Sequence, residues 1–415
     1  MHWIPTKMAL SVASVSTALV LSACGGGGSD TSTKVTYTSL VSFGDSLSDV
    51  GTYKVGAIAA VGGGRFTVNG TTTGPVNWTE LLAGQVNLPA PCPAQTGLLS
   101  NIPQIPLVAV SPNANCTNYA QGSSRVTLLA APNSVALQSA PANATNIGLM
   151  AVPLVTQFAA HLAAHGNYSG TELVTVMAGA NDVFMHITAV SAVQTYVVAA
   201  TGGTANAGQI ALALGAAQAS AFYAGWNSTE IAAVSAPNAS AVNAAATAAV
   251  AHMAEHAVTL AGYIQASVVG KGAKHVVVVN IPSIENTPFG QGSGAPALLN
   301  SMVTTFNSNL KNALVGTLGV LLVDAYTQGV DQYNNPAQYG ITNVTHPACS
   351  TTAPSATYPA GNILLGSSLA CTVNNTLAGV DVSTYFYADP VHPTPAGYKL
   401  LNRFVAEQMA KVGWL

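Results

Sequence analysis

The sequence predicts an α/β fold in which helices cover both faces of a central, mostly parallel sheet, giving a three-layer α/β/α sandwich. Short apolar runs rich in β-branched residues recur along the chain without strict alternation, which is typical of strands buried on both faces. Alanine-rich stretches of helical composition separate these runs. Because strands that alternate with helices indicate βαβ units, we expect the strands to pair in parallel.

The individual elements follow from these patterns. The expected strands are the apolar runs 40–43, 173–178, 275–281 and 320–323. The expected helices cover 151–165, 205–224, 239–268, 299–314 and 395–411. Two regions rich in Pro, Asn, Gly and Thr are expected to be loops around a site, 62–118 and 327–384. The alanine-rich region 187–250 is long for a connection, which makes it a candidate for a flexible lid.

The composition excludes several classes of protein. Half of the 415 residues are hydrophobic (49%), only 6% are charged, and the net charge is −3; ordinary soluble proteins have roughly 25% charged residues. The 11 Lys and Arg form no basic run, so we expect no nucleic-acid partner. High apolar content and low net charge exclude disorder of the whole chain. Beyond residue 23 we expect no membrane-spanning helix.

The N-terminus has the parts of an export signal. Lys7 precedes an uncharged, mostly apolar run over 8–23, and small residues lead to Cys24. This ending resembles the bacterial lipoprotein signal, which implies lipidation of Cys24 and an envelope protein held by a lipid anchor, facing the periplasm or the exterior. Plain secretion is the alternative. The expected organisation is a signal peptide over 1–23, the lipidated cysteine and a flexible linker over 24–36, and one catalytic domain over 37–415.

The four remaining cysteines are expected to form two disulfides, because an even number in an exported protein indicates paired cysteines. Four cysteines allow three pairings, and proximity in the sequence favours Cys92 with Cys116 and Cys349 with Cys371. Each bond would close a loop of about 23 residues and contribute roughly 3 kcal/mol by the loop-entropy estimate. Four free, buried thiols are the alternative. The absence of a Cys-x-x-Cys pair argues against a zinc site.

Two segments at opposite ends of the chain carry residues suited to nucleophilic catalysis. GDSLSD at 44–49 follows the first strand, so Ser46 should lie at the carboxyl edge of the sheet, beside free N–H groups at a helix start. A serine nucleophile needs a base, and the base needs an orienting acid. DPVHP at 389–393 supplies Asp389 and His392 from a single turn. Taken alone, the first segment also suits a helix cap and the second a solvent-facing turn.

Two further segments offer hydrogen-bond donors for an oxyanion. In GAND at 179–182, Asn181 directly follows the second strand, and its side-chain amide is a suitable donor. In NYAQGSSR at 118–125, Gly122 has no Cβ, so its backbone N–H can approach a substrate closely.

Together, and in this order, these four segments resemble the GDSL or SGNH family of serine esterases and lipases, from about residue 40 to the C-terminus. Other stretches are similar to the long bacterial lipase/phospholipase branch of that family: VVVVNIPSIENTP at 276–288, FNSNL at 306–310, VDAY at 323–326 and YGITN at 339–343. The resemblance implies a flavodoxin-like SGNH hydrolase domain.

The resemblance also implies residue roles. Ser46 would be the nucleophile, His392 the general base and Asp389 its orienting partner. The oxyanion hole would consist of the Ser46 N–H, the Gly122 N–H and the Asn181 side chain. No metal or cofactor is required. The sequence departs from the pattern at Thr52, where the branch often has Asn, and in NYAQGSSR, where a double glycine is more usual.

The expected function is therefore an esterase or lipase that acts on acyl esters or lipids by acyl transfer. A phospholipase or glycerophospholipid acyltransferase is the enzymatic alternative, and removal of acetyl groups from a polysaccharide is a weaker third. A surface binding protein with a degenerate site is the alternative from another class.

Other residues have competing interpretations. HMAEH at 252–256 spells an inverted zinc-protease signature, but no further carboxylate ligand is identifiable. His161 and His165 fit the polar edge of an amphipathic helix, and Asp182 fits a helix cap. Five aromatic residues are candidates for an acyl pocket, although aromatic residues are more often part of a core: Phe66, Trp78, Phe184, Tyr223 and Trp226.

Overall fold

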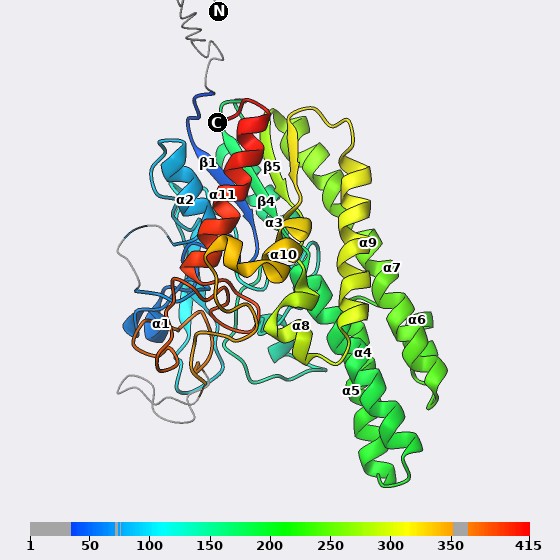
Figure 1. Cartoon of the computed structure of the whole chain (residues 1–415). Coiled ribbons are helices and arrows are strands. Elements are labelled where there is room, and N and C mark those ends of the chain that lie inside the picture. The colour runs from blue at the N-terminus through cyan, green and yellow to red at the C-terminus, as the bar shows by residue number, and fades with distance from the viewer. Residues whose placement is uncertain (1–34, 71–73, 75, 352–363) are drawn as a thin grey trace, which may run out of the picture. The chain divides into compact units, whose positions relative to one another are not determined.

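The computed structural model describes residues 35–70, 74, 76–351 and 364–415 (Figure 1). Its central sheet has four strands in the order β1-β4-β5-β6, and every pair is parallel. These strands are β1 (Leu40–Gly44), β4 (Leu173–Met177), β5 (His275–Val279) and β6 (Val320–Val323). The predicted fold class and all four predicted strands are confirmed.

Alternate residues of the strands pack on opposite faces of the sheet. On one face, Phe43 and Val176 pack with α3 (Leu154–His165), α4 (Ala180–Thr201), α7 (Ala239–Tyr263) and α9 (Pro296–Leu314). On the other face, Leu173 and Val277 pack with α2 (Trp78–Gln85) and α11 (Pro395–Lys411). The strands are buried on both sides, which explains their continuous apolar character.

The remaining elements are shorter or lie away from the sheet. The helices are α1 (Gly56–Ala60), α5 (Ala207–Ala224), α6 (Ser228–Val234), α8 (Pro288–Gly292) and α10 (Ala325–Asn334). A separate antiparallel pair consists of β2 (Gln95–Leu98) and β3 (Val108–Pro112). Short single turns cover Val135–Gln138, Ile264–Val268, Val269–Lys271, Ile284–Asn286 and Pro336–Tyr339.

The regions expected to be loops contain regular structure. The region 62–118 includes α2 and the β2–β3 pair, and 327–384 includes most of α10. The candidate lid at 187–250 consists of long helices, with α5 packed beside α4 and α6 beside α7 (Figure 1). α4 is also long and apolar enough to cross a membrane by length and composition alone, which the sequence analysis did not expect. Half of its apolar window is buried within the protein, as in the core helix of a globular domain.

Both predicted disulfides form. Cys92 is bonded to Cys116, and Cys349 to Cys371. The first disulfide lies near β1, because Thr117 contacts Leu40 and Ser42, and the second lies beside Ala388, where the Cys349 N–H donates to the Ala388 carbonyl. Both disulfides indicate an extracytoplasmic location. The predicted signal peptide and Cys24 lie outside the described residues, and Val35–Leu415 form one unit by their contacts.

Candidate active site

Ser46 lies in the turn that follows β1, at the carboxyl edge of the sheet. It is 7% exposed, and its Oγ is 2.8 Å from Nε2 of His392. The turn is held by Gln157 of α3, whose side chain accepts from the N–H of Gly44 and donates to its carbonyl oxygen, both at 2.9 Å. The structure thus brings together two residues from opposite ends of the sequence.

The Asp389–His392 pair is fixed within its own loop. Nδ1 of His392 is 2.7 Å from Oδ2 and 2.9 Å from Oδ1 of Asp389. Because a carboxylate only accepts hydrogen bonds, Nδ1 carries the hydrogen and Nε2 is left to accept from the Ser46 hydroxyl. The Asp389 carboxylate also accepts the N–H groups of Val391, His392 and Ser368, at 2.9, 2.8 and 3.1 Å.

These contacts keep Asp389 ionised. Burial alone would raise the pKa of Asp389, but the charge of His392 and the hydrogen bonds to the carboxylate outweigh burial and hold the pKa well below its usual range. A fixed negative charge beside Nδ1 stabilises a positive charge on the ring. The Ser46–His392–Asp389 arrangement therefore has the polarity needed to move a proton from the serine hydroxyl to the histidine.

Asn181, predicted to be an oxyanion donor, is the second residue of α4, which follows β4 after a two-residue connection. One of its amide hydrogens is donated to the carbonyl oxygen of Ser124 at 3.0 Å. The amide has two hydrogens, so one remains available. Asn181 lines the same pocket as Ser46 and His392.

Gly122 does not have a free N–H, in contrast to the prediction. Its N–H donates to Oδ2 of Asp49 at 2.9 Å. The lack of a side chain at Gly122 serves packing instead, because a Cβ there would lie 2.2 Å from the Phe66 ring. Asp49 is fully buried and also accepts from Gly51 and Thr52, so it connects the turn after Ser46 to the Gly122 segment.

The next residue, Ser123, has a feature that the sequence analysis missed. Its φ is +67°, a left-handed conformation that is unfavourable for a residue with a side chain. Within the described residues, neither the Ser123 N–H nor the Ser46 N–H forms a hydrogen bond. Gln121 donates to the Gly44 carbonyl at 3.1 Å, and Ser124 accepts from Asn181, so Ser123 lies between two anchors of the site. The one sequence feature that pointed to this position is that Ser123 follows Gly122 where the family more usually has a second glycine.

A buried ion pair joins this segment to α4. Nε of Arg125 is 2.8 Å from Oδ1 of Asp182, and both side chains are 0% exposed. Asp182 also accepts from the Val126 N–H at 3.0 Å. The prediction that Asp182 is a helix cap is wrong, because its carboxylate is used by Arg125 and Val126. Breaking one partner of a buried ion pair is costly, so this pair locks Asn181 against the Ser123 segment.

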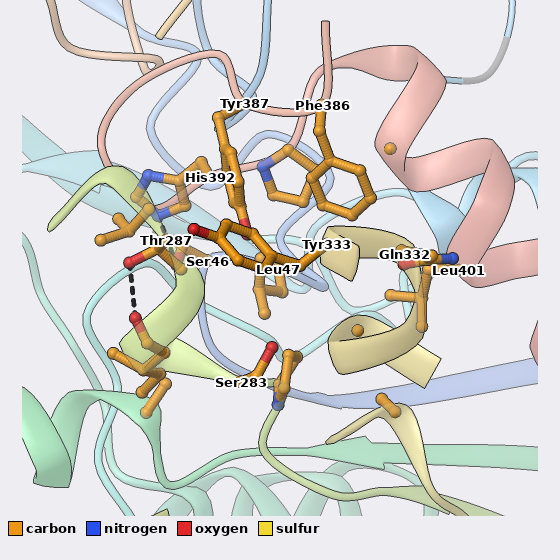
Figure 2. A pocket seen from close by; sticks show the side chains of 18 of the residues that line it. Ser46, Leu47, Ser283, Thr287, Gln332, Tyr333, Phe386, Tyr387, His392 and Leu401 are labelled. Carbon is orange, nitrogen blue, oxygen red and sulfur yellow. Dashed lines mark hydrogen bonds between the residues drawn. The ribbon is translucent and has the colours of Figure 1, made fainter. Parts of the chain in front are cut away.

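An apolar pocket of about 100 Å³ opens beside Ser46 (Figure 2). Its apolar walls come mainly from Leu47, Phe184, Ile284, Tyr333, Phe386 and Leu401. Among the predicted aromatic candidates only Phe184 lines this pocket. Phe66 packs against the His392 ring at 5.0 Å between centroids, and Trp78 and Trp226 are buried in the core. The Tyr223 hydroxyl contacts the segment 139–142.

The histidines of the zinc-like signature belong to a packed cluster on the helices. Nε2 of His256 is 3.2 Å from Nε2 of His186, and Trp226 donates to the other ring nitrogen of His186 at 3.0 Å. The His252 ring contacts Glu230 and Glu255. In the part of the chain that the structure describes, no group of three or more His, Cys, Asp or Glu residues is arranged to hold a metal ion. His161 is buried and stacks on Tyr168 rather than lying at a polar edge.

A serine hydrogen-bonded to a His–Asp pair, at the carboxyl edge of a parallel α/β sheet, defines this protein as a candidate serine hydrolase. The chain matches the family model of the GDSL-like lipase/acylhydrolases over residues 40–405 and belongs to this family, so it is an ester hydrolase. A search of curated proteins found no match.

Proposed function

We propose that the protein is a carboxylesterase or lipase that cleaves uncharged acyl esters by acyl transfer through Ser46, His392 and Asp389. The observation that carries this proposal is the continuous chain of hydrogen bonds from Ser46 through His392 to Asp389, at 2.8 and 2.7 Å. The Ser46 end of this chain lies in an apolar pocket. The complete arrangement argues against a binding protein with a degenerate site.

In the first half of the reaction, Nε2 of His392 takes the proton of Ser46 as Oγ attacks the ester carbonyl. Asp389 stays ionised and stabilises the imidazolium. The tetrahedral intermediate collapses as His392 gives the proton to the leaving alcohol oxygen, and Ser46 carries the acyl group. Water, activated by the same histidine, then releases the acid. Each proton lost by a nucleophile is gained by a leaving group, so this cycle needs no metal or cofactor.

The oxyanion hole in this proposal differs from the predicted one at a single position. The Ser46 N–H and the second amide hydrogen of Asn181 remain donors. The Ser123 N–H takes the place of the Gly122 N–H, because the latter is occupied by Asp49. The left-handed backbone at Ser123 is the kind of local strain that accumulates at functional sites.

The pocket favours an uncharged substrate. The described residues that line it include no Lys, Arg or Glu, and its single Asp, Asp45, is 1% exposed. A phospholipase or acyltransferase would need recognition of a phosphate headgroup near this pocket, and the similarity to the long bacterial branch keeps that activity as the second candidate. Hydrolysis of phosphatidylcholine vesicles compared with triglyceride and simple esters separates the two.

For the location, we propose a lipid-anchored envelope protein in which Cys24 is the acylated first residue of the mature chain. The N-terminal sequence and the two disulfides support export. Mass spectrometry of the mature N-terminal peptide tests this proposal: an acylated Cys24 supports it, and an unmodified peptide indicates plain secretion.

The catalytic proposal is tested by comparing wild type with Ser46→Ala on p-nitrophenyl esters from acetate to palmitate. We expect the variant to fall to background hydrolysis while retaining its circular dichroism spectrum. Ser301→Ala is the matched control, because Ser301 is exposed on α9 and contacts only its own helix. Equal activity of wild type and Ser46→Ala would contradict the assignment of the nucleophile. A folded wild type that hydrolyses none of these esters would contradict the proposed esterase activity.

A further inference from the structure

Three hydroxyl groups in the pocket beside Ser46 form no hydrogen bond within the described part of the chain. They belong to Ser283, Tyr333 and Tyr387, and all three residues line the pocket. Ser283 is 3% exposed and Tyr387 is 8% exposed, so their hydroxyls are shielded from bulk solvent. Burial raises the pKa of Tyr387 well above its usual range, which keeps its hydroxyl protonated and able to donate. These groups therefore have hydrogen-bonding capacity that the fold itself does not use.

The three hydroxyls come from separate elements that meet at the pocket. Tyr333 belongs to α10, Ser283 follows β5, and Tyr387 lies shortly before His392 in the chain. Figure 2 shows the Tyr333 hydroxyl extending across the pocket toward His392 and the Ser283 hydroxyl pointing into the pocket. At Gly329, α10 packs closely on Ser283, because a Cβ there would lie 3.1 Å from the Ser283 Oγ. This close packing fixes the position of Ser283 relative to the helix from which Tyr333 projects.

An unpaired, buried hydroxyl has a free-energy cost, and this cost affects what the pocket binds well. Water satisfies such a group in a free enzyme, but a hydrocarbon chain that displaces the water leaves the hydroxyl unpaired. A substrate that carries an oxygen at this place restores the hydrogen bond, since a hydroxyl both donates and accepts. A charged oxygen is disfavoured, because the described residues that line the pocket include no Lys or Arg.

We propose that this pocket selects esters with a second uncharged oxygen function, a hydroxyl or a carbonyl, in the part of the substrate that fills it. The hydroxyls of Tyr333, Ser283 and Tyr387 bind that oxygen. Hydroxyacyl esters and esters of glycerol-like alcohols share this chemistry, whereas plain alkyl esters lack it. The inference rests on the proposed esterase function and narrows its substrate class.

The substrate preference is measured with two matched pairs of short esters, chosen because the cavity volume is about 100 Å³. p-Nitrophenyl butyrate and p-nitrophenyl β-hydroxybutyrate differ by a hydroxyl in the acyl half. Propyl butyrate and glycerol monobutyrate differ by hydroxyls in the alcohol half. We expect wild type to have a kcat/KM about tenfold or more higher for the oxygenated ester of at least one pair, because the plain ester leaves buried hydroxyls unpaired.

Three variants test whether the hydroxyls cause this preference. Tyr333→Phe, Tyr387→Phe and Ser283→Ala each remove one hydroxyl and keep the rest of the side chain. We expect the preference, taken as the ratio of the two kcat/KM values, to fall roughly three- to tenfold in each variant, the usual net effect of one hydrogen bond. A general loss of folded enzyme would lower both values in proportion and leave the ratio unchanged. Tyr263→Phe is the matched control, because Tyr263 is exposed at the end of α7 and is not part of the pocket lining.

Activity on the plain esters separates this inference from the function on which it rests. If wild type is folded but cleaves none of the four esters, the proposed esterase function fails, and this inference fails with it. If wild type cleaves them without preferring the oxygenated ester of either pair, only the inference is overturned. It is also overturned if all three variants keep the wild-type ratio.

Discussion

The two halves of the candidate site are held in place by different means. Asp389 and His392 belong to one loop, and Asp389 accepts the backbone N–H of His392 as well as its ring, so the pair is held mainly within four residues of local chain, with one further hydrogen bond from the Ser368 N–H. The segment 121–126 is held by residues far away in the sequence: Asp49, Asn181 and Asp182. A change in the loop should therefore act on chemistry, whereas a change in the segment should act on folding and chemistry together.

The largest expected effect is at Asp389. In Asp389→Asn the amide group can donate to Nδ1 of His392, which favours the wrong tautomer of the ring. By analogy with other triads, kcat should fall about 10⁴-fold, with little change in fold. Asp381→Asn is the matched control, since Asp381 is exposed and its side chain contacts only Ser383. Steady-state kinetics that retain more than a tenth of wild-type kcat would contradict the role of Asp389.

A smaller effect is expected at Asn181. Removing one oxyanion donor by Asn181→Ala should lower kcat by about 10²–10³-fold and change KM less. Asn309→Ala is the control, because the Asn309 amide donates only to the Thr305 carbonyl in its own helix. If both variants had wild-type kcat, Asn181 would be a structural residue that supports Ser124 and nothing more.

Within the segment 121–126, the neighbouring residues Gly122 and Ser123 are expected to respond differently to substitution. Gly122→Ala places a methyl group against Phe66 and should lower the free energy of unfolding by about 1–3 kcal/mol in urea denaturation. Ser123→Gly keeps the N–H and removes the backbone strain, so stability should stay the same or rise by up to about 1 kcal/mol, with kcat within a few-fold of wild type. A stable, fully active Gly122→Ala variant, together with an inactive Ser123→Gly variant, would contradict our assignment of the oxyanion donor to Ser123 and of a packing role to Gly122.

The same contrast explains what could be predicted from the sequence. The apolar runs predicted the strands of the sheet. The positions of Ser46 and Asn181 just after two of these strands predicted that both residues lie at the carboxyl edge of the sheet. The local spacing of Asp389 and His392 was enough to pair them. The role of the Gly122 N–H was not predictable, because its partner, Asp49, lies 73 residues away.

The pocket was harder to predict than the polar residues. Tyr333 and Gly329 fall in a region whose composition indicates a loop, and no periodic pattern marks the face of α10 that they share. The long helices α4 to α7 were only partly expected, because alanine-rich composition gives weak information on boundaries. The apolar walls of the pocket come from elements that are far apart in the sequence and meet only in the fold. No local pattern in the sequence shows which of these elements meet.

The smallest expected effect is on the pH dependence of stability. It concerns His161, which burial keeps neutral, in contrast to the ionised Asp389. Burial lowers the pKa of His161 to about 4, with a further contribution from His165. The unfolded state then binds more protons than the native state below about pH 6.5, so stability should fall as the pH drops from 6.5 towards 4. His161→Phe should flatten this dependence by on the order of 1 kcal/mol in denaturation curves at pH 7 and pH 5. An unchanged slope would show that His161 does not contribute.

The central claim is that Ser46, activated by His392, is the nucleophile. The most direct measurement is to label the protein with a fluorophosphonate and locate the adduct by peptide mass spectrometry. The account predicts a single adduct on Ser46 in wild type, with labelling strongly reduced in His392→Ala. An adduct on another residue, or rapid ester hydrolysis by a protein whose Ser46 never reacts, would contradict it.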